Sequence, residues 1–351
     1  MRIGAPTAAL AIALLAGAAQ AFTPAARTIK DWTAVCDNVG TCAGFGFAPD
    51  DSETPIFLRI TREAGPAAAP GALIVYDPAD AHKDQRWTLS VDDKPVVGAG
   101  VVTARGGDSG ARATLDAAQT AALIEALRNG RRLGVLRDGK PIGTVSLAGS
   151  FATLLWVDAD QGRAGTVTAM IDRGGRPASS VPPPAPAPVI DPAPPISQAH
   201  LPKLAPPGLI ASNGDCDIQV TLKQLGTSPD DIVARLSPGV VLWAPECSLA
   251  AYNETNLLFL GDESGAHTRP LRLPTADGGA RDDNELVDAA FDPKTQTLTT
   301  FAKGRGVGDC GDSAQWVWDG QAFRLLSEFS MSECEGVPPD DWPALYVARL
   351  K

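Results

Sequence analysis

The chain has 351 residues, with 30 lysines and arginines against 41 aspartates and glutamates, and its formal net charge is −11. Nucleic acids and anionic membrane surfaces bind proteins through basic patches, so this charge disfavours both classes of partner. The acidity lies at one end: residues 208–351 carry 11 basic against 22 acidic residues (−11), whereas residues 22–207 carry 18 against 19 (−1). A cationic partner would therefore bind the C-terminal part.

The first 21 residues have the pattern of a secretory signal peptide. Arg2 supplies the positive charge, residues 8–18 form a short apolar run, and Ala19-Gln20-Ala21 fits a small-x-small cleavage site. No other segment has the length of a membrane span. We expect cleavage after Ala21 and a mature chain in the periplasm or secreted.

Six cysteines in an exported chain are expected to form disulfides. Cys36 and Cys42 form a pair near the mature N-terminus, and the other four lie in the last third of the chain. Those four allow three pairings. We favour Cys216–Cys247 and Cys310–Cys334, since each closes a loop of a few tens of residues, and we expect no metal and no cofactor.

Composition divides the mature chain into three parts. Residues 177–207 are dominated by proline and alanine, which favours an extended, semi-rigid linker. We expect a β-rich domain with two helices at 22–176 and an acidic, disulfide-bonded β-rich domain at 208–351. The fold class is mainly β, with α+β character at the edges: two antiparallel domains that resemble sandwiches or barrels.

Hydrophobic periodicity predicts the elements of the first domain. Asp116 with Gln119 three residues later predicts a helix that starts with a capping box and ends near Asn129-Gly130. A second, shorter helix is expected to be capped by Ser150. The expected strands are at 32–36, 56–60, 72–76, 87–91, 133–136, 142–147 and 166–171.

The second domain is expected to be almost entirely β. A helical turn is predicted at 230–235, and residues 298–336 read as two hairpins tied by cysteines. The remaining expected strands are at 216–221, 240–243, 256–260, 271–273 and 286–291.

The glycine-rich stretch 306–311 matches the letters of the dinucleotide-binding fingerprint. That motif requires a helix after the last glycine, whereas the β-type run Trp316-Val317-Trp318 follows here. Asp158–Gly162 resembles the start of a calcium loop but lacks the later ligands. The chain also has no Gly-x-Ser-x-Gly, Ser-x-x-Lys or His-Glu-x-x-His motif.

Four residues are candidates for ligand binding: Arg305, Asp309, Trp316 and Trp318. Trp316 and Trp318 share one strand face, so they line either a core or an exposed aromatic platform, and the core is favoured. An exposed platform beside Arg305 and carboxylates would suit a sugar or a cationic peptide.

Three segments together resemble an exported bacterial family known as domain of unknown function 1176. They are Asp31-Trp32 through Asn38 with Cys42, residues 240–253 with Cys247, and residues 303–343 with Cys310 and Cys334. The resemblance covers nearly the whole mature chain and implies no established activity.

The first domain alone is also similar to the invasion-associated locus B family of envelope proteins. The shared features are the Asp-Trp…Cys opening, the helix near 116–128 and the passage Ser146–Phe151. This similarity implies a sandwich-like fold and an envelope location.

These observations favour a non-enzymatic envelope protein that acts in binding or envelope maintenance, with a cationic or glycan ligand. The alternative is a hydrolase of carbohydrate or peptidoglycan that uses two carboxylates, because acidic residues are abundant and their separation is a property of the fold.

Overall fold

The computed structural model describes residues 22–351 except 51, 53, 79–81, 109, 212–215, 217 and 227. The predicted leader, residues 1–21, lies outside this range. The described chain is mainly β and its sheets are antiparallel apart from one short parallel pair, which confirms the predicted fold class. No described helix is long and apolar enough to cross a membrane.

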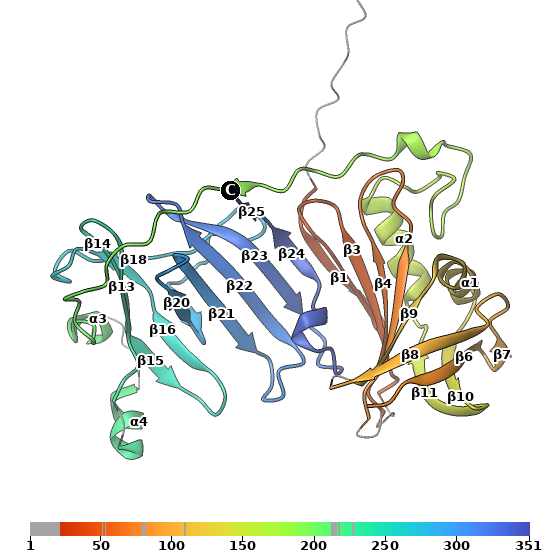
Figure 1. Ribbon diagram of the computed structural model, residues 1–351, viewed down its shortest axis with the longest axis horizontal. Helices are drawn as coiled ribbons and strands as arrows, with labels where there is room; N and C mark the ends of the chain where they lie inside the picture. Colours follow the sequence, from red (N-terminus) through yellow and green to blue (C-terminus); the bar gives the residue numbers. More distant parts are fainter. Residues whose placement is uncertain are drawn as a thin grey trace, which may run out of the picture.

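One curled sheet makes up most of the N-terminal part (Figure 1). Its strands run in the order β1-β2-β3-β4-β5-β9-β8-β6-β10-β11, with β7 against β6. Their bounds are β1 Ala25–Ile29, β2 Trp32–Cys36, β3 Cys42–Phe47, β4 Ile56–Arg62, β5 Gly71–Tyr76, β6 Gln85–Val91, β7 Lys94–Pro95, β8 Val101–Gly107, β9 Gly110–Leu115, β10 Arg132–Arg137 and β11 Lys140–Ser146.

Two helices pack on one face of this sheet, α1 (Ala117–Leu127) and α2 (Ser150–Asp160). Asp116 caps α1 and forms the predicted capping box with Gln119. The second cap differs from the prediction, because Ser150 is already helical and Gly149 is the N-cap, with φ of 102°. A Cβ at Gly149 would lie 2.0 Å from the carbonyl oxygen of Ile29, so this position requires glycine.

The opposite face of β3, β4 and β5 is covered by the C-terminal part of the chain. Phe45, Phe57 and Val75 pack there against Met331 and Trp342. These strands are therefore buried on both faces, which explains why their sequences are nearly continuous apolar runs.

The C-terminal part contains three antiparallel sheets. They are the five-stranded β20-β21-β22-β23-β24, the four-stranded β13-β14-β17-β18 and the three-stranded β15-β16-β19. The strand bounds are β13 Ile232–Ser237, β14 Val240–Ala244, β15 Glu246–Leu249, β16 Glu254–Leu257, β17 Phe259–Gly261, β18 Arg269–Pro270, β19 Glu285–Val287, β20 Ala290–Asp292, β21 Thr297–Lys303, β22 Gly311–Trp318, β23 Phe323–Met331 and β24 Ala344–Val347. Two helices, α3 (Gly208–Ala211) and α4 (Ile218–Leu225), and the short 3-10 turns η1 (Ala178–Ser180) and η2 (Pro339–Asp341) complete the elements.

Four local predictions are wrong. The strand predicted at 271–273 does not form, because β18 ends at Pro270 and the N–H of Leu271 donates to the carbonyl of Leu258, which lies between two strands. The strand predicted at 216–221 is replaced by α4, whose apolar residues Ile218, Leu222 and Leu225 have helical spacing. The helical turn predicted at 230–235 is strand β13, since Ile232 and Val233 are β-branched and pair with β14. Residues 166–171 form no strand, and the backbone N–H groups of Met170 and Ile171 donate instead to the Asp158 carboxylate.

The proline-rich segment 177–207 runs extended along one side of both halves (Figure 1). Within it, β12 (Val189–Ile190) pairs in parallel with β25 (Arg349–Leu350) at the C-terminus. Ala193 N–H donates to the carbonyl of Trp318 at 2.8 Å. These bonds attach the segment to the surface along part of its length.

The six cysteines form three disulfides: Cys36–Cys42, Cys216–Cys247 and Cys310–Cys334. None of the six is free. Three disulfides indicate an oxidising compartment, such as the periplasm or the extracellular space.

Candidate functional site

Trp316 and Trp318 lie in the hydrophobic core between the four-stranded and five-stranded sheets. Their residues are 1% and 2% exposed. The indole N–H of Trp316 donates to the carbonyl of Pro274 at 2.7 Å, and that of Trp318 donates to the hydroxyl of Ser237 at 2.9 Å. Neither ring offers a face to a ligand, so the exposed platform considered from the sequence does not form.

Arg305 and Asp309 form an ion pair inside the glycine-rich loop. Arg305 Nε donates to Asp309 Oδ1 at 2.7 Å, and the N–H of Gly336 donates to Asp309 Oδ2 at the same distance. The hydrogen bond from Arg305 is the main reason that the pKa of Asp309 lies below its usual range. Strand β22 begins directly at Gly311, so this loop does not open a helix for a phosphate.

A histidine, an acid and a serine meet at the exposed turn 262–267. His267 Nδ1 lies 2.6 Å from Asp262 Oδ2, and the Ser264 hydroxyl donates to Asp262 Oδ1 at 2.5 Å. These bonds lower the pKa of Asp262 to about 2, with the Ser264 bond the largest cause. The hydroxyl contacts the carboxylate rather than the imidazole, so this is not the arrangement that activates a serine nucleophile.

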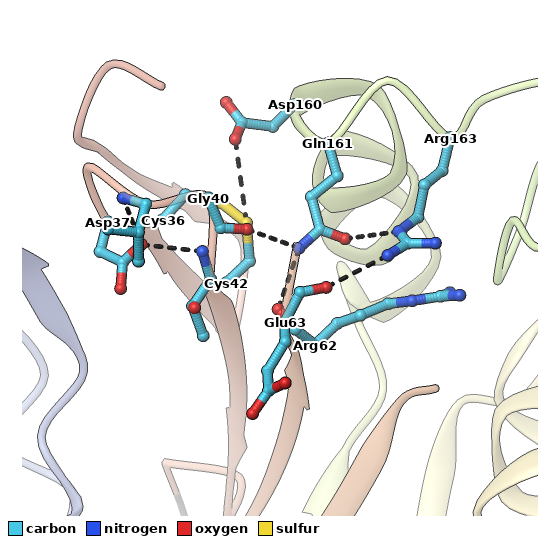
Figure 2. Close-up of a disulfide and its surroundings, with 11 residues drawn as sticks. Cys36, Asp37, Gly40, Cys42, Arg62, Glu63, Asp160, Gln161 and Arg163 are labelled. Atoms are coloured by element: carbon cyan, nitrogen blue, oxygen red, sulfur yellow. Dashed lines mark hydrogen bonds between the residues drawn. A yellow bond between two sulfur atoms is a disulfide. The ribbon is translucent and has the colours of Figure 1, made fainter. Parts of the chain in front are cut away.

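Figure 2 shows the Cys36–Cys42 disulfide beside the C-terminal end of α2. Asp160 Oδ2 lies 3.8 Å from Cys42 Sγ, and burial raises the pKa of this carboxyl group. A disulfide sulfur carries no proton, so this approach is a contact and not a hydrogen bond. Gln161 Nε2 donates to the Gly40 carbonyl at 2.8 Å and fixes the helix to the β2–β3 turn. Both cysteines are at most 1% exposed, so the cluster has a structural role.

A groove of about 520 Å³ lies on the outer face of β6, β10 and β11, which we call the β10 groove. Its centre is the cross-strand row Ser90, Gly134 and Thr144, in which the middle strand carries no side chain. A Cβ at Gly134 would lie 2.7 Å from Ser90 Oγ. The groove therefore exists because this strand position is glycine.

Hydroxyl groups surround this hollow. Thr88, Ser90 and Thr144 line it, and their side chains make no hydrogen bond with any described residue. Leu136 on the same face pairs with Thr88 on one side and Pro141 on the other, which adds an apolar wall. The floor can thus bind polar groups through free hydroxyls and C–H groups through the wall.

The other end of the β10 groove is charged. Arg132 Nη2 lies 3.5 Å from Asp93 Oδ2, and the two side chains are 62% and 90% exposed. An exposed pair of this kind is weak, so both groups can turn to a ligand. Asp93 is the only carboxylate among the described lining residues, whereas acid–base hydrolysis of a glycoside requires two.

Comparison with known proteins places the chain in a family. A family model described as "Protein of unknown function (DUF1176)" matches residues 26–349. The chain belongs to this family. The uncharacterized protein YpfG of Escherichia coli (strain K12) is 31% identical over an alignment of 347 positions, which covers 93% of this chain and 94% of that protein. No solved structure matches the chain.

The DUF1176 resemblance inferred from the sequence is thereby confirmed. The similarity to the invasion-associated locus B family stays a prediction.

The sequence reasoning missed the β10 groove. The available signal was Gly134 in the middle of an otherwise regular strand, between the inward residues Leu133 and Val135. A glycine inside a strand marks a close approach or a hollow. The hydroxyls come from β6 and β11, and only the pairing of these strands with β10 brings them to the glycine.

Proposed function

We propose that this protein is a non-enzymatic, exported binding protein that holds an oligosaccharide of the cell envelope in the β10 groove. The observation that supports this is the group of three unpartnered hydroxyls, Thr88, Ser90 and Thr144, around the side-chain-free position Gly134. Ser90 and Thr144 are half-buried, and hydroxyls at such positions usually have protein partners, so two free ones beside the exposed hydroxyl of Thr88 favour a polar ligand.

The chemistry of the groove favours a saccharide over a charged peptide. A sugar presents hydroxyls to donors and acceptors on one side and C–H groups on the other. The guanidinium of Arg132 is a fork of donors, and the Asp93 carboxylate is an acceptor for paired hydroxyls. Leu136 supplies the apolar surface. One positive and one negative charge leave the groove without a net preference for a cation or an anion.

A glycan microarray with the mature chain tests the proposal, followed by calorimetric titration with the best-bound glycan. The array includes soluble peptidoglycan fragments with N-acetylated sugars. Gly134→Val should fill the groove and abolish binding. The fold should stay intact, because Ser90 Oγ can rotate away from the new side chain. Thr103→Val, on the exposed side of β8, is the matched control and should bind like the wild type.

The hydrolase alternative gives a different result in the same experiment. New reducing ends, formed during incubation and lost in a variant of one carboxylate, would identify an enzyme and overturn the non-enzymatic proposal. Failure of every glycan on the array to bind would overturn the choice of ligand.

A further inference from the structure

The hairpin of β15 and β16 carries three oxygen-bearing side chains on one face. Glu246 on β15 lies directly opposite Asn256 on β16, and Glu254 precedes Asn256 by two residues on the same strand. Opposite residues of an antiparallel pair have Cβ atoms about 4.5–5.5 Å apart, and residues two apart share a face. The two carboxylates and the amide therefore lie on one face of the hairpin.

Asn256 has an acceptor that is left without a partner. Its residue is 0% exposed, and its Nδ2 donates to the carbonyl of Ala244 at 3.3 Å, while Oδ1 accepts no hydrogen bond from the described residues. A buried acceptor without a donor is destabilising, so such an atom in a folded chain calls for an explanation. A bound cation is one such explanation, and the neighbouring carboxylates favour it.

Glu246 is also buried, at 3% exposed, without a basic partner among the described residues. One of its carboxylate oxygens accepts the backbone N–H of Asp230 at 3.0 Å, and the other accepts nothing from the described chain. Buried carboxylates are usually paired with a basic group or coordinated to a metal.

The surroundings of Glu254 are strongly negative. Asp288 Oδ1 accepts the backbone N–H of Glu254 at 2.8 Å, and Asp230 is held beside Glu246 by its backbone N–H, so two further acidic residues adjoin the pair. Lys303 pairs with Asp288: its Nζ lies 3.5 Å from Asp288 Oδ2 and donates to the Tyr252 carbonyl. Neither Glu246 nor Glu254 has a basic partner within ion-pair distance among the described residues, which leaves an excess of negative charge.

We propose that Glu246, Glu254 and the amide oxygen of Asn256 bind a calcium ion. All three ligands are hard oxygen donors, which calcium prefers, and the group contains no nitrogen or sulfur donor of the kind that zinc and copper prefer. Calcium also tolerates irregular geometry and takes water as additional ligands. With three protein ligands, the affinity belongs to the weak range of extracellular modules, with a Kd on the order of 0.1–1 mM.

This site is separate from the β10 groove and does not depend on the proposed function. It would fix the β15–β16 hairpin, which also carries the Cys216–Cys247 disulfide. The bound calcium would have a structural role in the acidic C-terminal part of the chain.

Calcium titration of the mature chain by calorimetry tests this proposal directly. Binding should appear at sub-millimolar to millimolar calcium, and 10 mM CaCl₂ should raise the melting temperature by roughly 2–5 °C above KCl of equal ionic strength. Glu254→Gln should weaken binding at least tenfold. Asp282→Asn removes the same charge from an exposed position and should leave the affinity unchanged.

A second variant covers the case in which Glu254→Gln does not fold. Asn256→Asp adds a buried negative charge, so its melting temperature should be lower without calcium and should rise with calcium by more than that of the wild type. Absence of calcium binding, equal affinities of the Glu254→Gln and Asp282→Asn variants, or a calcium response of Asn256→Asp no larger than the wild type would each overturn the proposal.

Discussion

Asp341 and Arg112 form a two-point ion pair between parts of the chain that are 229 residues apart. Arg112 Nη1 donates to Asp341 Oδ2 at 2.6 Å, and Arg112 Nη2 donates to Oδ1 at 2.7 Å. Arg59 donates to the same carboxylate from β4 at 2.8 Å. Asp341 is 4% exposed, so its carboxylate joins the outer face of the N-terminal sheet to the last 3-10 turn.

Replacing Asp341 by asparagine should destabilise the protein. Two partly buried guanidinium groups would lose their charged acceptor, and we expect a loss of about 2–4 kcal/mol in the free energy of unfolding. Asp340→Asn removes a charge from the exposed neighbour and should cost less than about 0.5 kcal/mol. Urea denaturation compares the two, and equal midpoints would show that the ion pair does not join the two parts.

Trp318→Ala tests the placement of the tryptophans in the core. The Trp318 side chain is fully buried and packs edge-on against Phe323, so its truncation should lower the free energy of unfolding by about 3–5 kcal/mol. Val307→Ala, at a residue that is 79% exposed, should change the stability by less than about 0.5 kcal/mol. If Trp318→Ala cost as little as Val307→Ala, the ring would lie at the surface, as in the platform interpretation.

The Arg305–Asp309 pair predicts a pH dependence of stability. The folded-state pKa of Asp309 is lower than its unfolded value, so the pair contributes stability above the unfolded pKa of about 3.9 and loses it as the pH falls through the folded value. Because the Arg305 side chain is 51% exposed, solvent screens the pair, and we expect at most about 1 kcal/mol.

The test measures the free energy of unfolding of Arg305→Gln and of the wild type from pH 6 to pH 3. Their difference in unfolding free energy should be largest at pH 6 and should shrink toward pH 3. Arg27→Gln makes the same substitution at an exposed residue of β1 and should show no such trend. A difference that grows on acidification would contradict the assignment.

The disulfides are expected to differ in their contributions to stability. Cys36 and Cys42 are separated by 6 positions in the sequence, and Cys310 and Cys334 by 24. In the chain-entropy model these loops give about 2.4 and about 3.5 kcal/mol. The double alanine variant of Cys310 and Cys334 should therefore be the less stable one. The reverse order in urea denaturation would contradict this.

The sequence predicted the elements whose signal is local. The capping box of Asp116, the β10–β11 hairpin and the run of strands β21 to β23 follow from neighbouring residues, because caps, turns and alternation act within a few positions. The same reasoning failed at α4, where a short apolar segment fits both periods, a common ambiguity for eight residues.

The sequence did not predict features that depend on contacts between distant parts of the chain. The apolar runs of β3 and β5 indicate two buried faces, but the sequence does not say that Trp342 and Met331 cover the second one. The β10 groove likewise depends on strand pairing between residues more than forty positions apart, Ser90 and Gly134. Both depend on topology, which periodicity does not determine.

Binding in the β10 groove is measured by calorimetry, in which a glycan identified on the array is titrated into the wild type, Gly134→Val and Thr103→Val. We expect saturable binding by the wild type and Thr103→Val, no binding by Gly134→Val, and no new reducing ends in any sample. Equal binding by Gly134→Val and the wild type would contradict the assignment of the β10 groove as the binding site.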